Sequence, residues 1–238
     1  MQIDDLWPDG PRFIQGTPVF KLGTDVVLLA HFTNTARMTR AVDLGSGTGV
    51  LGILLAMDTP TLTFDAVDIL PEAVALTGEN ARLNGVGDRV IPHLADICAI
   101  RETLPAGAYD LVVSNPPYFP VGGGARAEGA EIADARDELR CSLDDLCAAA
   151  AYLLRWGGRF ALVHRPERLA EIWGAMQKHG IEPKRLRTVS KAADLAPSLV
   201  LIEGRRGGNP GLVFEPPLCL QDGAGGDSAE IKEIYHRR

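Results

Sequence analysis

Short β-rich runs alternate with helix-like segments from residue 40 of this 238-residue chain onward. This alternation constrains the fold most strongly, because it is typical of βαβ units, whose parallel strands form one sheet covered by helices on both faces. The expected strands are residues 41–44, 62–69, 89–94, 109–114, 159–163, 185–189 and 198–202. The expected helices are residues 50–57, 71–84, 143–153 and 166–179. Pro71 suits a first helical turn, and Ser142 can cap the helix that follows it.

The two ends of the chain lie outside this alternation. Its length favours one structural domain, which we divide into an N-terminal extension (1–39), an α/β region (40–204) and a C-terminal segment (205–238). The segment after Gly204 is rich in Gly and Pro, which predicts a hairpin and an irregular tail with a short strand at 212–214.

Composition and cysteine usage favour a cytoplasmic protein. No apolar run approaches the roughly 18 residues that span a bilayer, and the acidic N-terminus lacks the basic flank of a secretion signal. The cysteines form no CxxC pair, so we expect reduced core residues and no metal site. They are Cys98, Cys141, Cys147 and Cys219.

The net charge of −7 is unevenly distributed along the chain. Residues 155–206 carry 11 Lys and Arg against 5 Asp and Glu, and a basic surface acts over the short distances that salt leaves unscreened. Overall acidity therefore does not exclude an RNA partner. In the expected strand around 185–189, Arg185 and Arg187 share one face. They form either an RNA-binding patch or the charged face of an edge strand.

Acidic residues follow three successive strands. Asp43 precedes the glycine-rich turn Gly45-Ser46-Gly47, Asp68 ends the second strand, and Asp96 follows the third. Glycines let a backbone approach a ligand at a helix N-terminus, and a strand-end carboxylate can bind ribose hydroxyls. Together they predict a nucleoside pocket at the carboxyl edge of the sheet. The turn also fits a dinucleotide fingerprint at residues 47–52, so a dehydrogenase remains the main alternative from these residues alone.

The tetrapeptide Asn115-Pro116-Pro117-Tyr118 follows the fourth strand. The Asn115 side-chain oxygen and the Pro116 carbonyl can each accept one N–H of a planar NH2 group, and consecutive prolines hold these oxygens rigidly. Tyr118 offers a ring on which an extruded base could stack. The motif thus indicates an NH2 acceptor, either an aromatic amine or a glutamine amide. A rigid structural turn is the alternative. A loop of about 20 residues follows, in which Arg126 and Arg136 could meet phosphates.

These features resemble the class I S-adenosylmethionine-dependent methyltransferases, in the branch with Asn-Pro-Pro-Tyr. More narrowly, five segments resemble the bacterial adenine-N6 methyltransferases that modify a valine tRNA beside its anticodon. These segments are residues 15–25, 135–138, 164–169, 181–185 and 215–218. The resemblance implies a Rossmann-like seven-stranded sheet with an antiparallel last strand, and an N-terminal extension that packs on the cofactor site.

The resemblance also implies functional residues. The implied S-adenosylmethionine contacts are Lys21, Thr24, Asp43, Gly45, Ser46, Gly47, Asp68, Ile69, Asp96, Ile97 and Asn115. The expected catalytic residues are Asn115, Pro116 and Tyr118. The expected substrate contacts are Pro117, Tyr118, Phe119, Arg185 and Arg187. We therefore expect adenine-N6 methylation of tRNA. The alternatives are methylation of another RNA base or a protein glutamine, and a non-catalytic cofactor-binding partner.

Overall fold

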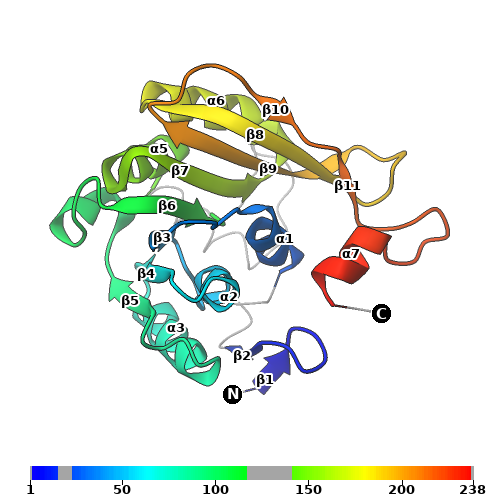
Figure 1. Cartoon of the computed structure of the whole chain (residues 1–238), viewed down its shortest axis with the longest axis horizontal. Helices are drawn as coiled ribbons and strands as arrows, with labels where there is room; N and C mark the ends of the chain where they lie inside the picture. Colours follow the sequence, from blue (N-terminus) through cyan, green and yellow to red (C-terminus); the bar gives the residue numbers. More distant parts are fainter. Residues whose placement is uncertain (1, 16–22, 117–140, 237–238) are drawn as a thin grey trace, which may run out of the picture.

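The computed structural model describes residues 2–15, 23–116 and 141–236 (Figure 1). Its strands are β1 (Gln2–Asp5), β2 (Arg12–Gln15), β3 (Arg40–Leu44), β4 (Thr63–Asp68), β5 (Val90–Leu94), β6 (Tyr109–Ser114), β7 (Leu154–His164), β8 (Ile181–Ser190), β9 (Pro197–Arg206), β10 (Val213–Phe214) and β11 (Leu218–Cys219). Its helices are α1 (Thr24–Phe32), α2 (Val50–Asp58), α3 (Pro71–Leu83), α5 (Leu143–Leu153), α6 (Leu169–Lys178) and α7 (Ala229–Ile234), with 3-10 helices η1 (Ile97–Glu102) and η2 (Pro166–Arg168).

The expected α/β fold is confirmed by a central sheet in the order β10-β8-β9-β7-β6-β3-β4-β5. Neighbours from β7 to β5 pair in parallel, whereas β9 is antiparallel to both β7 and β8. Seven long strands match the expected number, and the two-residue strands β10 and β11 extend the sheet by pairing with β8. The chain order reverses between β3 and β6, which makes their carboxyl ends a topological switch point, where open α/β sheets bind ligands.

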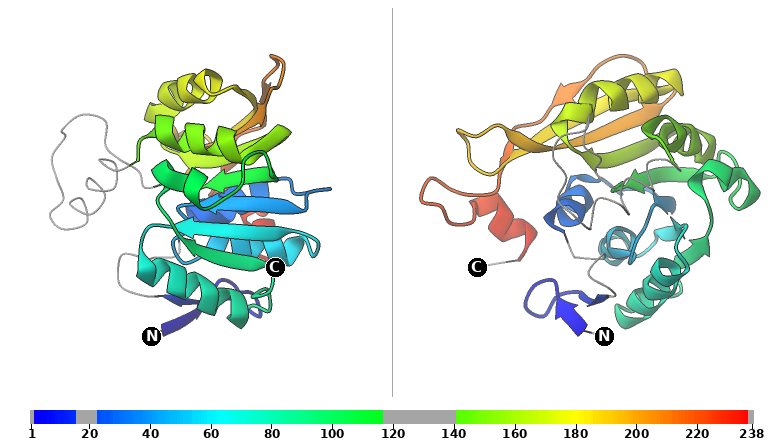
Figure 2. Two further views of the ribbon diagram at one scale, coloured as in Figure 1. Left: turned by 90° about the vertical axis from the view of Figure 1, so that its left-hand side faces the viewer. Right: turned by 180° about the vertical axis from the view of Figure 1, so that it is seen from behind.

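Helices cover both faces of the sheet (Figure 2). Residues of α1, α2 and α7 pack with alternate strand residues such as Ala41 and Phe64 into one apolar cluster. Residues of α5, α6 and η1 pack with the intervening strand residues, such as Val42 and Val67, into a second. Both clusters follow from the alternation of side chains along a strand.

Local signals set several helix boundaries. Pro71 occupies the first position of α3, and Ser142 forms a capping box with Asp145 at the start of α5. The expected helix at 166–179 is instead divided into η2 and α6. Strands β7, β8 and β9 are longer than expected, because residues flanking their apolar centres also join the ladders.

The N-terminal extension contains a hairpin that the sequence did not predict. Strands β1 and β2 pair antiparallel and form a separate two-stranded sheet. This hairpin is fastened to α3: the Asn84 side chain accepts from the Arg12 N–H at 2.9 Å and donates to the Arg12 carbonyl at 2.7 Å. The hairpin therefore lies beside the helix that follows β4 (Figure 1).

The C-terminal segment matches the expected hairpin only in part: the chain reverses at 222–226, where Gln221 and Asp227 form an isolated antiparallel bridge, but β10 and β11 form no hairpin. Both β10 and β11 run parallel to β8, so they do not pair with each other. Helix α7, which was not expected, then packs through Ile231 and Ile234 against the cluster around α1 and α2. The expected short strand at 212–214 is present as β10. Because β10 and β11 cover its outer side, β8 is not an open edge strand.

In the part of the chain that the structure describes, no helix combines the length and apolarity required to cross a bilayer. The four cysteines are free thiols, but only Cys147 is a core residue, whereas Cys98 is exposed. The expectation that all four belong to the core was therefore wrong.

Candidate active site

The acidic strand-end residues and Asn115 meet at the carboxyl edge of the sheet, around the switch point between β3 and β6. Asp43 and Asp68 lie within the last residues of β3 and β4. Asp96 follows β5, and Asn115 follows β6. Because these four strands are adjacent and parallel, the topology brings together residues that lie far apart in sequence.

The turn between β3 and α2 has a backbone conformation that favours glycine. Gly45, Gly47 and Gly49 have φ values of 75°, 54° and 81°. Ideal Cβ atoms at Gly45 and Gly47 would meet no described atom within 4 Å, so the turn borders open space. The backbone N–H groups of Gly45 and Ser46 both donate to the Val67 carbonyl at 2.9 Å, which anchors the turn to β4. The turn is a backbone cradle next to a helix N-terminus.

Asp68 ties this turn to β4. Its Oδ2 accepts from the Gly47 N–H at 2.8 Å, and its Oδ1 accepts from the Leu70 N–H at 2.9 Å. A carboxylate oxygen has two acceptor positions, so two such bonds do not saturate the group. The residue is only 9% exposed. Asp68 can therefore orient the glycine turn and still accept from a diol.

Asp43 is buried beneath the turn. The Gly52 N–H donates to its carboxylate, yet its Oδ2 has no hydrogen-bond partner among the described residues, and the same holds for the Ser46 Oγ. Burial, with a smaller repulsion from Asp68, raises the pKa of Asp43 to about 7. Buried polar atoms without partners are uncommon and require an explanation. A polar ligand in the cradle would supply the missing partners.

The end of β5 supplies an apolar wall with an acceptor beside it. Ile69, which follows β4, is 37% exposed, and Leu94, the last residue of β5, is 57% exposed. Asp96 accepts from the Cys98 N–H at 2.8 Å and thereby caps η1, where Ile97 is half-buried. Exposed apolar side chains next to a carboxylate suit an aromatic base with an exocyclic amine. Leu94 was not among the predicted site residues, although its position two residues before Asp96 could have identified it.

These observations fit S-adenosylmethionine, the cofactor that the sequence resemblance implies. Its ribose diol, adenine ring and charged amino-acid end require a paired acceptor, an apolar wall and polar groups near a glycine turn. The described residues offer all three at one edge of the sheet. Thr24 lies exposed in the first turn of α1, and Lys21 lies outside the described residues.

Asn115 and Pro116 lie beside the turn. The Ser114 hydroxyl donates to the Leu44 carbonyl at 2.7 Å, which joins the last residues of β6 and β3. The next residue on each strand is Asn115 and Gly45 respectively, so the predicted amine acceptor borders the cradle. Both Asn115 and Pro116 are half-buried. Other predicted site residues lie outside the described residues: Pro117, Tyr118, Phe119, Arg126 and Arg136.

Two side chains of α3 hold the turn from its other side. The Thr77 hydroxyl donates to the Gly47 carbonyl, and the Asn80 amide donates to the Thr48 carbonyl, both at 3.0 Å. Asn80 is fully buried and also accepts from the Ile14 N–H of β2 at 2.7 Å. It therefore connects the N-terminal hairpin to the glycine turn. Sequence reasoning missed this role, although polar residues at 77, 80 and 84 share one face of the expected helix.

Arg185 and Arg187 do share one face of β8, but the structure directs them into the protein. Arg185 Nε donates to Glu215 at 2.7 Å, Arg185 Nη1 lies 3.3 Å from Glu203, and the guanidinium stacks on the Phe32 ring at 4.3 Å. Arg187 forms a two-bond pair with Glu230 at 2.6 and 2.7 Å. Both residues therefore attach the C-terminal segment to β8, and their expected contact with RNA stays a prediction.

Comparisons with known proteins identify the family of the chain. The family model "Methyltransferase small domain" matches residues 20–172. A curated relative from Parabacteroides distasonis, named tRNA1(Val) (adenine(37)-N6)-methyltransferase, is 33% identical over 185 residues, covering 77% of this chain and 76% of the relative. A relative of the same name from Tolumonas auensis is 32% identical over 203 residues, covering 85% and 82%.

Solved structures support the fold. A predicted O-methyltransferase from Agrobacterium tumefaciens superposes with a TM-score of 0.74 at 20% identity, covering 90% of this chain and 97% of that one. A geranyl diphosphate methyltransferase solved in complex with S-adenosylmethionine superposes with a TM-score of 0.55 at 16% identity, covering 75% and 82%. At such identities these neighbours indicate shared architecture and not shared substrates.

Proposed function

The chain belongs to the methyltransferase small domain family, and from that premise we propose that it methylates the N6 amine of an adenine in tRNA, beside the anticodon of a valine tRNA. Family membership makes the chain an S-adenosylmethionine-dependent methyltransferase and decides against the dehydrogenase interpretation of its glycine turn. The choice of substrate is supported by the similarity to relatives named for this reaction, over most of both chains.

The observation that carries the proposal is the position of Asn115, which follows β6 and borders the glycine turn at the switch point. The bound cofactor supplies an electrophilic methyl group on a sulfonium. The Asn115 side-chain oxygen and the Pro116 carbonyl each accept one N–H of the target amine. These two hydrogen bonds favour the form of the nitrogen whose lone pair is no longer delocalised into the ring. They also direct that lone pair at the methyl group for in-line attack.

The remaining described residues position the reactants. Asp68 accepts from the ribose diol, and Asp96 accepts from the adenine amine of the cofactor. Asp43 and Ser46 interact with its polar end. The Ser114 bond to Leu44 fixes the spacing between the amine acceptors and the cradle, so a shift of one strand would misalign the reacting atoms.

Product analysis tests the proposal. The purified protein is incubated with labelled S-adenosylmethionine and either tRNA or a protein extract, and the tRNA nucleosides are identified by mass spectrometry. We expect label in tRNA as N6-methyladenosine. Label in another nucleoside, or in protein glutamine, would contradict the proposed acceptor, because the tetrapeptide also suits those NH2 groups.

The Asn115→Ala variant links the product to this site. One preorganised polar group is worth about 10²–10³-fold in turnover, so the variant should lose that much while its cofactor affinity changes much less. Ser142→Ala, which alters only the cap of α5, is the matched control. Near-normal turnover of Asn115→Ala would remove Asn115 from the reaction.

A further inference from the structure

Five of the 11 basic residues of segment 155–206 form ion pairs with described carboxylates. The pairs are Arg155 with Asp110, Arg168 with Glu171, Lys178 with Asp144, Arg185 with Glu203 and Glu215, and Arg187 with Glu230. Two consecutive arginines at the end of β9, Arg205 and Arg206, differ from these. Within the described ranges, no carboxylate lies within ion-pair distance of either guanidinium. Their charge is available to a ligand.

Trp156 lies beside these arginines and is 76% exposed, the largest exposure among the large hydrophobic side chains that the structure describes. Its indole lies on the backbone of Gly207, where a Cβ atom would collide with the ring. Gly207 has a φ of 64°. Gly157 has a φ of 80°, and a Cβ there would lie 3.2 Å from Arg205 Nη2. Two glycines thus allow an indole and a guanidinium to lie directly on the backbone.

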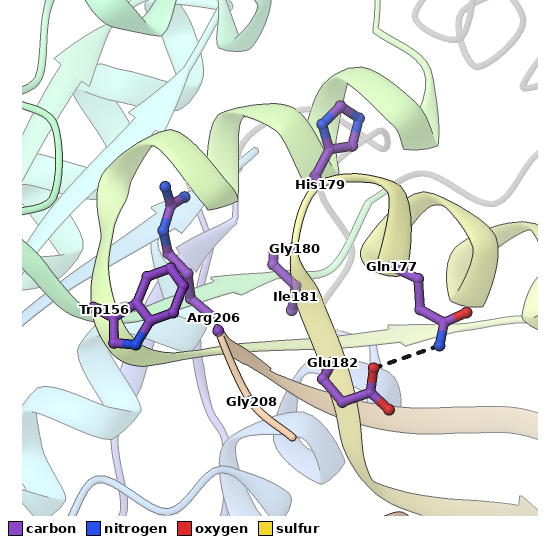
Figure 3. A pocket seen from close by; sticks show the side chains of 9 residues that line it. Trp156, Gln177, His179, Gly180, Ile181, Glu182, Arg206 and Gly208 are labelled. Carbon is purple, nitrogen blue, oxygen red and sulfur yellow. Dashed lines mark hydrogen bonds between the residues drawn. The ribbon is translucent and has the colours of Figure 1, made fainter. Parts of the chain in front are cut away.

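A cavity of about 230 Å³ opens next to the indole (Figure 3). It is lined by Trp156, Gln177, His179, Gly180, Ile181, Glu182, Arg206, Gly207 and Gly208. The Gln177 amide donates to the Glu182 carboxylate at 3.4 Å, and these two groups retain further donor and acceptor positions, whereas His179 Nε2 is bonded to Asp144 at 3.0 Å. Such a lining suits the edge of a nucleobase, while Arg206 contributes positive charge at the same place. We call Trp156, Arg205, Arg206 and this cavity the indole platform.

The indole platform lies far from the candidate active site. Trp156 lies at the amino end of β7, in an irregular stretch that precedes the regular ladder from Arg159 to His164 at the carboxyl end. A strand rises about 3.3 Å per residue, so these five steps alone separate the two ends by about 16 Å. A ligand that contacts both the platform and the strand ends must be longer than a single nucleotide.

We propose that the indole platform binds a nucleotide of the RNA substrate away from the target adenine, with its base stacked on Trp156 and its phosphate paired with Arg205 and Arg206. This inference rests on the proposed function. Aromatic rings accept any unstacked base, and guanidinium groups bind phosphate through paired hydrogen bonds. RNA is favoured over an acidic-surfaced protein partner, because the platform combines an exposed aromatic ring with two guanidinium groups.

Two substrates of different length test the inference. Trp156→Ala should raise the KM for full-length tRNA about 5–150-fold, the scale of one base–aromatic stack, and leave kcat unchanged. The KM for a short stem-loop that carries only the target adenine should not change, because that RNA cannot reach the platform. Phe214→Ala is the matched control, since Phe214 is a 71% exposed aromatic at another place. Trp156→Phe, which retains an aromatic ring, should recover part of the affinity for full-length tRNA. This recovery would distinguish a lost stacking contact from a folding defect of Trp156→Ala.

The salt dependence of tRNA binding tests the charges. Each phosphate contact contributes about 0.7–0.9 to the slope of log K against log salt, so replacing Arg205 and Arg206, which share one phosphate, by Ala should flatten the slope by about that amount. Lys232→Ala, an exposed cation on α7, should leave it unchanged. If the wild-type protein methylates no RNA, the proposed function fails. If it methylates tRNA but Trp156→Ala keeps a wild-type KM and the double variant a wild-type slope, the indole platform has no RNA role.

Discussion

At the scale of single residues, Asp43 and Asp68 show how neighbouring carboxylates take different roles. Asp68 receives two backbone N–H groups and lies at the border of the cradle, whereas Asp43 lies beneath it with one oxygen lacking a described partner. The first environment supplies two N–H donors to the Asp68 carboxylate, whereas burial in the second raises the pKa of Asp43.

Asp68→Ala should weaken S-adenosylhomocysteine binding by about 1.5–3 kcal/mol, the scale of hydrogen bonds to a charged group. The loss would combine the diol contact with loosening of the turn at Gly47. Isothermal titration calorimetry measures the affinity, and Asp58→Ala, at the exposed end of α2, is the control. Unchanged affinity would exclude Asp68 from the cofactor site.

Asp43 should make folding stability depend on pH. Its pKa is about 7 in the folded chain against 3.8 ordinarily, so the native state binds the additional proton between these values. Stability therefore falls as pH rises from about 4 to about 7, by up to about 4 kcal/mol. In urea unfolding across this range, Asp43→Asn should remove that part of the decline. Curves that run parallel for both proteins would show that Asp43 is already ionised at low pH.

At the scale of elements, α3 connects two regions through one row of side chains. Asn84 bonds to the hairpin and Thr77 bonds to the glycine turn. Asn80 bonds to both the hairpin and the turn. The helix thus provides a physical link from the N-terminal hairpin to the cradle. If a ligand stabilises the cradle, Asn80 should couple part of that stabilisation to the hairpin, and the coupling free energy is equal in both directions.

Asn80→Ala should weaken S-adenosylhomocysteine binding about 5–30-fold, which corresponds to one or two kcal/mol. Asn84→Ala removes a similar backbone clasp one turn away and should bind within about twofold of wild type. Hydrogen exchange supplies a second readout: the ligand should slow exchange of the Ile14 amide in wild type and less so in Asn80→Ala. Equal protection in both proteins would show that hairpin and cradle are independent.

At the scale of the whole molecule, ion pairs attach the C-terminal segment to the central sheet. Glu215 and Glu230 reach back from the segment to Arg185 and Arg187 on β8, and Arg187 Nε also donates to the Pro216 carbonyl at 2.8 Å. Arg187 is only 12% exposed, so solvent screens its pair with Glu230 less than a surface pair.

Arg187→Ala should lower the free energy of unfolding by about 1.5–3 kcal/mol, the scale of hydrogen bonds between charged groups, and increase proteolysis near α7. The salt slope of tRNA binding should remain unchanged, in contrast to the Arg205 and Arg206 variant. Lys232→Ala on α7, the helix that carries Glu230, is the control for stability. A flattened slope would return Arg187 to the RNA-binding surface.

Much of the architecture follows from the sequence, because its determinants are local. Apolar runs of strand length, helical spacing, Pro71 and Ser142 each act over a few residues and place β3 to β6 within one or two positions. Since parallel strands end at one edge, the positions of Asp43, Asp68, Asp96 and Asn115 along the chain were sufficient to predict that they meet.

Contacts between distant polar groups were decided only by the tertiary structure. Asn80 and Ile14 are 66 residues apart, and Arg187 and Glu230 are 43 apart, so no periodicity relates them. The same limit applies to Arg185 and Arg187, whose shared face was predicted correctly while their partners were not. Periodicity shows which side of an element a residue occupies. How the elements pack decides which group the residue meets there. The packing also decides the burial that raises the pKa of Asp43.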